Sequence, residues 1–333
     1  MPTRLRFEEG TIRIDGDVPN LPYVESDPRS QTGRAPAFRY AELLAALDDA
    51  GIAYTDEVHY GTTLDLETAY ELREYQQGAL DSWHAADDRG VLELPTGSGK
   101  TVIAIAAIAQ LGVPTLVVVP TIDLLEQWRE ELQREFDVPI GQLGGGTQRV
   151  EALTVATYDS AYLRADELGD RFGFVVFDEV HHLGGEGYQE IARLLAAPAR
   201  MGLTATFERP DGAHETITDL VGPRVVQIDP EELAGEHLAD YDIKRIEVAL
   251  TPDERERYEE FQGTFTDYLA RSNLQLRSGA DYRKLVMRSG TDPAAREALL
   301  AKQRARELMM NADRKVEVLA DLLDRHAADR IIV

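Results

Sequence analysis

The residues best suited to chemistry in this 333-residue sequence lie in a glycine-rich segment, Pro-Thr-Gly-Ser-Gly-Lys-Thr at 95–101. The segment follows an apolar run and precedes a helical stretch, Val102–Gln110. Glycine lets successive backbone N–H groups turn toward phosphate oxygens, and the N-terminus of the following helix attracts anions. In such a loop the lysine contacts the β- and γ-phosphates and the last hydroxyl ligates Mg²⁺. We therefore predict a site for ATP and Mg²⁺ formed by Thr96, Gly97, Ser98, Gly99, Lys100 and Thr101.

A second segment supplies the acidic residues that nucleotide hydrolysis requires. Asp178 and Glu179 follow the apolar run Phe174–Phe177 and precede Val-His-His. We expect Asp178 to hold Mg²⁺ through water and Glu179 to orient and deprotonate the attacking water, because phosphoryl transfer depends on positioning and charge stabilisation. Acidic residues after a strand also cap helices, but the presence of Lys100 in the same chain disfavours that alternative. The predicted catalytic residues are Lys100, Asp178 and Glu179.

Other polar residues could read the nucleotide base or transmit the state of its phosphates. Arg73 and Gln76 precede the glycine-rich segment, and a glutamine amide can both donate to and accept from an adenine edge. Thr204 and Thr206 end a further apolar run, and their hydroxyls could relay the state of the γ-phosphate. His181 could ligate a metal in isolation, but the spacing offers no second pair of ligands. We therefore assign His181 to coupling or packing.

Two threonines are candidates for holding a nucleic-acid backbone. Thr121 and Thr157 each follow an apolar run and precede a helical stretch. Hydroxyls and helix N-termini at such positions can bind phosphates without reading sequence. Ordinary helix capping is the alternative, and local sequence favours it.

Short apolar runs that alternate with amphipathic helices predict a parallel α/β sheet of the RecA-like phosphate-loop kind. The expected strands are Val91–Leu94, Thr115–Val119, Leu153–Thr157, Phe174–Phe177 and Arg200–Leu203. Further strands are expected at Arg224–Ile228 and Ile243–Leu250.

The two ends of the chain have other patterns. Residues 1–65 predict a small α+β unit with a hairpin around Glu9-Gly10 and a helix over Phe38–Ala50. After Thr251, an expected N-cap, apolar spacing predicts a first helix and then two more, at Ala294–Asn311 and Arg314–His326.

The composition excludes several kinds of site. There is no cysteine, which excludes disulfides, zinc ribbons and cysteine-ligated iron–sulfur clusters. No apolar run approaches the ~20 residues of a membrane span and no secretory signal is present, so we predict a cytoplasmic protein without a membrane partner. A net charge of −25 and a cation content that is nearly all arginine indicate adaptation to concentrated salt, as in a halophile.

The distribution of charge bears on nucleic-acid binding. A net charge of −25 argues against a nucleic-acid partner. The segment 271–315, however, holds eleven cations and five acids, a net +6, which leaves −31 for the rest of the chain. We interpret this basic segment as a phosphate-binding surface, with DNA contacts at Arg283, Lys284 and Arg288. A solvated helix face is the alternative explanation of the same charges.

The order of these motifs resembles superfamily 2 helicases, and their details resemble the archaeal XPB-type DNA helicases over essentially the whole chain. The resemblance rests on Asp-Glu-Val-His-His at 178–182, Thr-Tyr-Asp-Ser-Ala at 157–161, Gly-Leu-Thr-Ala-Thr-Phe-Glu-Arg at 202–209 and the hairpin region at 9–12. The glycine-rich segment is similar to a helicase variant in which Leu94 stands where the general pattern has its first glycine.

The resemblance implies four domains. They are a damage-recognition-like N-terminal domain at 1–65, a RecA-like lobe at 66–250, a helical thumb insertion at 251–312 and the start of a second lobe at 313–333. It also implies an ATP-dependent DNA helicase or translocase that acts on double-stranded DNA, forked or damaged, in nucleotide excision repair or promoter opening. The basic segment then falls on the thumb, an element that clasps DNA.

Two departures from the family pattern affect these expectations. The Arg-Glu-Asp element linked to duplex opening reads Arg209-Pro210-Asp211 here, so proline restricts the backbone between the expected coupling residues Arg209 and Asp211. The chain also ends within an apolar run at Val333, as a truncated protein or one completed by another chain would. Arginine fingers of the second lobe contribute about 10³–10⁵ in rate in related systems, so we expect ATP binding with slow hydrolysis.

Two other classes of function remain open. A restriction-enzyme-like translocase would carry the same motifs and work with a nuclease or methyltransferase partner. An adaptor that binds distorted DNA would use ATP only as a switch, so its affinity for distorted duplex would survive the loss of Lys100. The basic segment argues against a third possibility, an ATP-switched regulator of other proteins.

Overall fold

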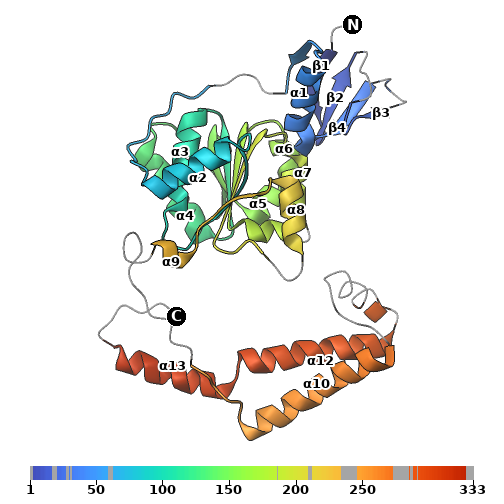
Figure 1. The fold of residues 1–333 in the computed structure, drawn as a ribbon, viewed down its shortest axis with the longest axis vertical. Helices are drawn as coiled ribbons and strands as arrows, with labels where there is room; N and C mark the ends of the chain where they lie inside the picture. The colour runs from blue at the N-terminus through green and yellow to red at the C-terminus, as the bar shows by residue number, and fades with distance from the viewer. Residues whose placement is uncertain are drawn as a thin grey trace. The chain divides into compact units, whose positions relative to one another are not determined.

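The computed structural model of the chain describes residues 3–16, 21–27, 30, 32–58, 63–185, 187–208, 212–233, 246–272, 285, 288–290 and 292–327. It divides into two compact units, residues 1–209 with 213–240 and residues 210–212 with 241–333. The first unit contains two sheets, and the second is helical (Figure 1). Within the described ranges, no helix combines the length and the apolar content needed to cross a membrane.

A small sheet with one helix opens the first unit. Its order is β3-β4-β2-β1-β5, antiparallel except where β5 runs parallel to β1. The hairpin expected around Glu9-Gly10 is present, and alternate residues of its strands point to the helix and are buried. The elements are β1 (Thr3–Glu8), β2 (Thr11–Asp15), β3 (Glu25–Asp27), β4 (Thr32–Pro36), a 3₁₀ turn η1 (Ala37–Arg39), α1 (Tyr40–Asp49) and β5 (Tyr54–Asp56).

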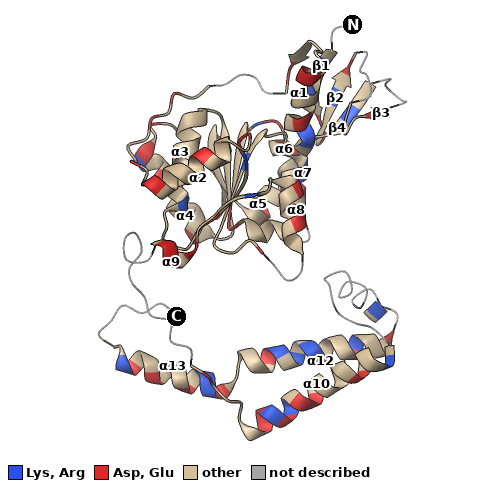
Figure 2. Ribbon diagram, in the orientation of Figure 1, with Lys and Arg blue, Asp and Glu red and all other residues tan. Residues whose placement is uncertain are grey.

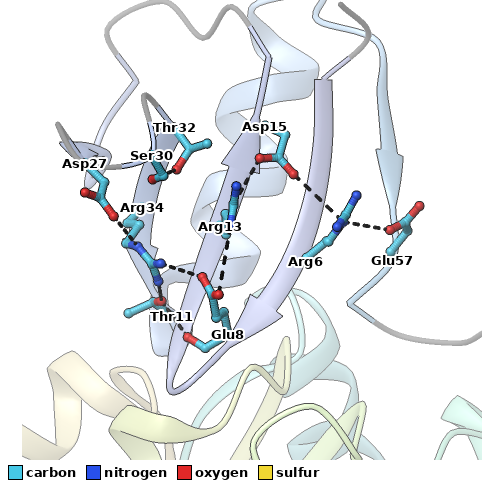
Figure 3. Close-up of polar contacts among 10 residues, drawn as sticks. All are labelled: Arg6, Glu8, Thr11, Arg13, Asp15, Asp27, Ser30, Thr32, Arg34 and Glu57. Atoms are coloured by element: carbon cyan, nitrogen blue, oxygen red, sulfur yellow. Dashed lines mark hydrogen bonds and ion pairs between the residues drawn. The ribbon is translucent and has the colours of Figure 1, made fainter.

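The other face of this sheet carries an alternating chain of arginines and carboxylates (Figure 3). Consecutive members pair at 2.5–3.9 Å. Each of the four arginines in this network pairs with one or two of its four carboxylates. The network therefore has no net charge. The sequence of pairs is Arg4–Glu57–Arg6–Asp15–Arg13–Glu8–Arg34–Asp27.

The small sheet packs against the ends of α6 (Ala165–Leu168) and α7 (Gln189–Leu194), two helices that cover the large sheet. Ala196 of the large-sheet domain belongs to the small sheet's core. The space beside Gly10 is filled by Leu194, and the space beside Gly169 by Phe7. Shared apolar burial therefore places both sheets in one unit.

The large sheet has the order β13-β6-β12-β11-β7-β10-β8-β9. Neighbouring strands are parallel except β8 and β9, which the sequence analysis missed. The strand expected at Ile243–Leu250 is wrong for the described residues 246–250, which form no strand. The strands are β6 (Arg89–Glu93), β7 (Thr115–Val119), β8 (Ile140–Gly144), β9 (Thr147–Arg149), β10 (Leu153–Thr157), β11 (Phe174–Asp178), β12 (Ala199–Thr204) and β13 (Arg224–Gln227).

Helices cover both faces of this sheet, which explains why its central strands are buried throughout. One core contains side chains of α2, α3 and α4, and the other contains side chains of α5, α6, α7 and α8. The helices are α2 (Glu74–His84), α3 (Lys100–Leu111), α4 (Ile122–Glu135), α5 (Tyr158–Leu163), α6 (Ala165–Leu168), a 3₁₀ turn η2 (Val180–Gly184), α7 (Gln189–Leu194), α8 (Ala213–Leu220) and α9 (Pro230–Leu233).

Arg200, in β12, is fully buried and makes no ion pair among the described residues. Its guanidinium donates to backbone carbonyls at 2.6–3.1 Å. Three of those carbonyls, on Ala192, Leu195 and Leu220, lie at the ends of α7 and α8. Helix C-termini carry unpaired carbonyls and partial negative charge, so one arginine satisfies two helices at once.

The second unit is built on α10 (Pro252–Ser272) and α12 (Pro293–Met310), followed by α13 (Asp313–Arg325). The buried face of α12 consists of alanines at 295, 298, 301 and 305, whose small side chains allow α10 to approach closely. The helix expected after Thr251 is present, and Thr251 and Glu254 cap each other as a capping box.

We expect Arg200→Met to lower the free energy of unfolding of the first unit by at least about 3 kcal/mol, because several buried carbonyls lose their donor. Chemical denaturation followed by circular dichroism measures this change. Arg193→Met is the matched control, since Arg193 is exposed and pairs with Glu190 on the same helix. A similar small effect of both substitutions would contradict the role assigned to Arg200.

Candidate nucleotide site

The predicted site residues lie at the carboxyl ends of neighbouring strands. Strands β6, β12 and β11 are adjacent, and their registers align Thr204 with Glu93 and Asp178 with Leu203. The glycine-rich segment follows β6, and the acidic pair ends β11. The crevice outside the carboxyl ends of parallel strands is where ligands bind in open α/β sheets.

The glycine-rich segment adopts a conformation that only glycine takes easily. Gly97 and Gly99 have φ of 83° and 81°, in the left-handed region. A Cβ on Gly99 would stand 2.5 Å from Nε2 of Gln76, so glycine is required for space as well. Gly99 is the N-cap of α3, where no side chain caps the first turn. The first N–H groups of α3 are therefore free of a capping side chain, as an anion site requires.

Lys100 is held at this loop by uncharged partners. Its Nζ donates to the carbonyl oxygens of Leu94 at 3.0 Å and Pro95 at 3.2 Å. Burial lowers the pKa of Lys100, and the negative charges of Glu179 and Asp178 act in the opposite direction. No carboxylate lies within ion-pair distance of Lys100 in the described part of the chain. A bound phosphate would supply the missing counter-charge.

Asp178 is buried, and each of its carboxylate oxygens accepts a hydrogen bond. Oδ2 accepts from Nε1 of Trp128 at 2.8 Å, and Oδ1 accepts from the backbone N–H of Glu179 at 3.0 Å. Burial raises the pKa of Asp178, whereas these two hydrogen bonds and the charge of Lys100 lower it. Each oxygen keeps a second acceptor position, which a water molecule on Mg²⁺ could use.

Glu179 stands in a backbone conformation that is uncommon for a residue with a side chain, with φ of 48°. Its Oε2 lies 3.3 Å from Nδ1 of His181, and the same Nδ1 lies 3.3 Å from Oγ1 of Thr204. Burial raises the pKa of Glu179, and Lys100 lowers it.

The hydroxyl of Thr204 fixes the direction of this contact. Its Oγ1 donates to the carbonyl of Thr206 at 3.0 Å and accepts from the N–H of Thr206 at 3.1 Å. While the hydroxyl proton is donated to Thr206, Oγ1 can accept from His181 in the tautomer that carries its proton on Nδ1. An unbroken path thus runs from Glu179 through His181 and Thr204 to Thr206.

Gln76 braces the phosphate loop rather than facing open space. It is 5% exposed. Its Nε2 donates to the carbonyl of Ser98 at 2.9 Å, and its Oε1 accepts from the backbone N–H of Arg73 at 2.9 Å. Tyr75, which the sequence analysis did not single out, donates to the same Ser98 carbonyl at 2.6 Å. Whether Gln76 also contacts adenine stays a prediction.

The remaining predicted residues lie elsewhere. Thr121 caps α4, because its exposed Oγ1 accepts a hydrogen bond from the N–H of Leu124. Thr157 is 8% exposed and bonds Ser160, which is the capping role of the alternative reading. Arg288 is exposed in the second unit. Arg209, Asp211, Arg283 and Lys284 lie outside the described residues.

The loop and the acidic pair suit Mg²⁺ and a triphosphate. Oγ of Ser98 is buried without a hydrogen-bond partner in the described structure. A buried polar atom left unpaired costs ~1–3 kcal/mol, which a ligand can offset. Thr101, on the first turn of α3, and Asp178 are the residues that would hold the ion.

Glu93, at the end of β6, is a further residue of this edge that was not predicted from the sequence. One of its oxygens accepts from Phe207 N–H at 2.9 Å, and the other from Nη1 of Arg224 at 2.7 Å. It thereby ties the strand before the phosphate loop to the segment after Thr206. A carboxylate in an apolar strand, Val91–Leu94, was the available signal.

We expect Gln76→Ala to weaken the binding of ADP and of inorganic tripolyphosphate alike, by about fivefold, because the loop loses one hydrogen bond of about 1 kcal/mol, the one that Gln76 donates to Ser98. Calorimetric titration measures both affinities. Gln77→Ala is the control, since Gln77 is exposed and bonds only Asp81. Loss of ADP affinity with unchanged tripolyphosphate affinity would instead show that Gln76 reads the base.

Two parts of the chain match described protein families. Residues 5–58 match the family described as "Xeroderma pigmentosum group B helicase damage recognition domain". Residues 69–209 match the family described as "Type III restriction enzyme, res subunit". The first match covers the small sheet and the second covers the loop and the acidic pair.

Several relatives have related names. The chain is 40% identical to "DNA 3'-5' translocase XPB2" of Sulfurisphaera tokodaii, over 99% of this chain and 74% of the relative. It is 37% identical to "Putative DNA 3'-5' helicase Rad25" of Haloarcula marismortui, over 56% of this chain and 31% of the relative. It is 31% identical to "DNA 3'-5' helicase XPB" of Mycobacterium tuberculosis, over 74% and 45%. The chain therefore spans most of the first relative and less than half of the other two.

Proposed function

Since the chain belongs to the XPB family of DNA helicases and translocases, we propose that it is an ATP-driven motor that moves on or opens duplex DNA. The observation that carries the proposal is the convergence of Lys100, Asp178 and Glu179 at neighbouring strand ends. The charges of these three residues act on one another, although 78 positions separate Lys100 from Asp178 in sequence. One triphosphate could therefore contact all of them.

Each residue has a role that follows from its surroundings. The N–H groups at the start of α3 and the ammonium of Lys100 bind phosphate oxygens. Mg²⁺, when bound, neutralises charge that develops on the transferred phosphoryl group. Glu179, whose carboxylate lies 3.3 Å from Nδ1 of His181, orients the attacking water and takes its proton.

The contacts of His181 would transmit the presence or loss of the γ-phosphate from Glu179 to Thr204. Thr204 and Thr206 end β12, beside the strand that leads into the phosphate loop. Loss of the γ-phosphate changes the charge next to Glu179, and the shared Nδ1 proton of His181 can follow it toward either partner. We therefore propose that Thr204 and Thr206, with Arg209 and Asp211 beyond them, couple hydrolysis to movement.

The second unit offers a basic surface for DNA. Cations are concentrated on α12, whereas α10 carries six acids and three cations (Figure 2). A groove of about 640 Å³ along α12 is lined by the cations Arg296, Lys302 and Arg306, by one acid, Glu307, and by neutral polar and apolar side chains. Nζ of Lys302 also lies 5.0 Å from the ring of Phe265. With Arg288, these residues are the proposed phosphate contacts, in addition to Arg283 and Lys284, which the sequence predicts.

The small sheet is the proposed sensor of forked or damaged duplex, on the strength of its family match. Its outer arginines are all paired with carboxylates (Figure 3). Binding there must exchange carboxylate for phosphate. The acidic chain and concentrated salt both weaken long-range attraction to DNA, so direct contacts carry the affinity.

Single-turnover ATP hydrolysis with and without forked duplex tests the motor. We expect DNA to raise the rate, and Glu179→Gln to lower it by about 10²–10⁴-fold while nucleotide binding persists, because a positioned base is removed. Lys100→Ala should abolish nucleotide binding and keep DNA binding. A hydrolysis rate that does not change when DNA is added would refute the motor and favour an ATP-switched adaptor. A nuclease that copurifies with the protein would favour a restriction-enzyme-like translocase.

We also expect the double substitution Arg296→Ala with Arg306→Ala to weaken duplex binding and to reduce the log–log salt slope by about 2, because two phosphate contacts are lost. Fluorescence anisotropy at several salt concentrations measures both quantities. Arg255→Ala with Arg257→Ala, on the acidic helix α10, removes the same charge. Equal effects of the two double substitutions would place the DNA elsewhere.

A further inference from the structure

Trp128 lies in α4, a helix that supplies none of the predicted metal ligands, and it contacts the predicted metal site. The residue is 1% exposed and donates from Nε1 to Oδ2 of Asp178 at 2.8 Å. The other tryptophan, Trp83, is equally buried and donates from Nε1 to the backbone carbonyl of Arg200 at 2.9 Å. Both indoles thus fill the same core and make one hydrogen bond each, but only Trp128 bonds a side chain of the site.

The contact fixes the plane of the Asp178 carboxylate. The terminal torsion of an aspartate is broad, so one hydrogen bond from the N–H of Glu179 to Oδ1 leaves the second oxygen free to swing. The indole N–H holds that oxygen, Oδ2. Because Trp128 is closely packed among apolar side chains, its donor cannot follow a rotating carboxylate. Each oxygen of Asp178 is left with one acceptor direction.

The same helix begins at Thr121, one of the two threonines for which the sequence predicts a contact with a nucleic-acid backbone. Thr121 caps α4, and Trp128 follows seven residues later, two turns along the helix and on the same face. A helix of this length moves as a rigid rod, so a shift of its N-terminus displaces the indole. α4 therefore joins a surface that DNA could pull on to the carboxylate that would hold Mg²⁺.

We propose that Trp128 is a positioning residue for the metal site, which sets the orientation of Asp178 for Mg²⁺ and makes that orientation depend on the position of α4. The proposal rests on the proposed function for the identity of the ion, and its link to DNA rests on the contact that the sequence predicts at Thr121. Partners of this kind, one bond removed from the ion, change metal affinity by about 10–100-fold when they are lost. Phenylalanine would keep the packing and remove only the donor.

The test compares Trp128→Phe with Trp83→Phe in Mg²⁺ titrations of ADP binding, measured by calorimetry. We expect Trp128→Phe to raise the half-saturating Mg²⁺ concentration by about tenfold, while ADP affinity in EDTA stays within about twofold of that of the unsubstituted protein. Trp83→Phe removes the same kind of hydrogen bond from the same core, so it should leave the Mg²⁺ dependence unchanged. Melting temperatures of both variants report any general loss of stability.

A second measurement keeps Trp128 intact. In Trp83→Phe the only tryptophan is Trp128, so its emission reports the surroundings of Asp178. We expect the emission to change when Mg²⁺ is added to the ADP complex, and to change again with duplex DNA. The proposal would be overturned if the Mg²⁺ dependence of ADP binding were unchanged in Trp128→Phe, or if the Trp128 emission in Trp83→Phe did not change on addition of Mg²⁺. A normal Mg²⁺ response without any response to DNA would refute only the link through α4 and the motor, not the positioning of Asp178.

Discussion

Opposite charges buried at one edge of a parallel sheet are the constraint on which the site depends. Burial works against the charged form of each residue, lowering the pKa of Lys100 and raising the pKa of Asp178 and Glu179. Mutual attraction favours the charged forms, but within the described residues Lys100 makes no direct ion pair with Asp178 or Glu179. Neutral donors and acceptors surround the charges instead, including the indole of Trp128 and the carbonyl of Leu94. The site is thereby kept charged and open to a charged ligand.

The same arrangement connects the site to the rest of the first unit. On one side, Glu179 reaches Thr206 through His181 and Thr204. On the other, Glu93 holds the backbone that follows Thr206. Both connections meet at the end of β12, so this short segment is linked to the acidic pair and to the strand before the phosphate loop. A change in the bound phosphate could therefore shift this segment by moving only a proton or a carboxylate.

Arginine has three different structural roles in this acidic chain. On the small sheet it alternates with carboxylates and neutralises the surface. In β12 a single buried arginine satisfies the ends of two helices. Along α12 it forms part of an exposed basic groove. The planar guanidinium, with five donors and a permanent charge, suits all three settings, whereas lysine offers only a point charge.

Much of the fold was predictable because its signals are local. The turn at Glu9-Gly10, the strands ending at Thr157 and Asp178, and the helix beginning after Thr251 all follow from residue preferences within a few positions. The missed pair β8 and β9 is short and weakly patterned. Of the strand expected at Ile243–Leu250, the described residues 246–250 form no strand, because an apolar run is necessary for a buried strand but does not ensure a neighbour to pair with.

The sequence by itself determined that a phosphate loop and an acidic pair exist, because glycine conformations and strand-end carboxylates are specified by neighbouring residues. Tertiary structure alone decided which side chains orient them. Trp128 lies 50 positions from Asp178, and His181 lies 23 positions from Thr204. Gln76 bonds the loop instead of standing open, since both ends of its amide find backbone partners once the chain is folded. Such partners depend on strand order and helix packing, and no local pattern encodes a distance across a folded sheet.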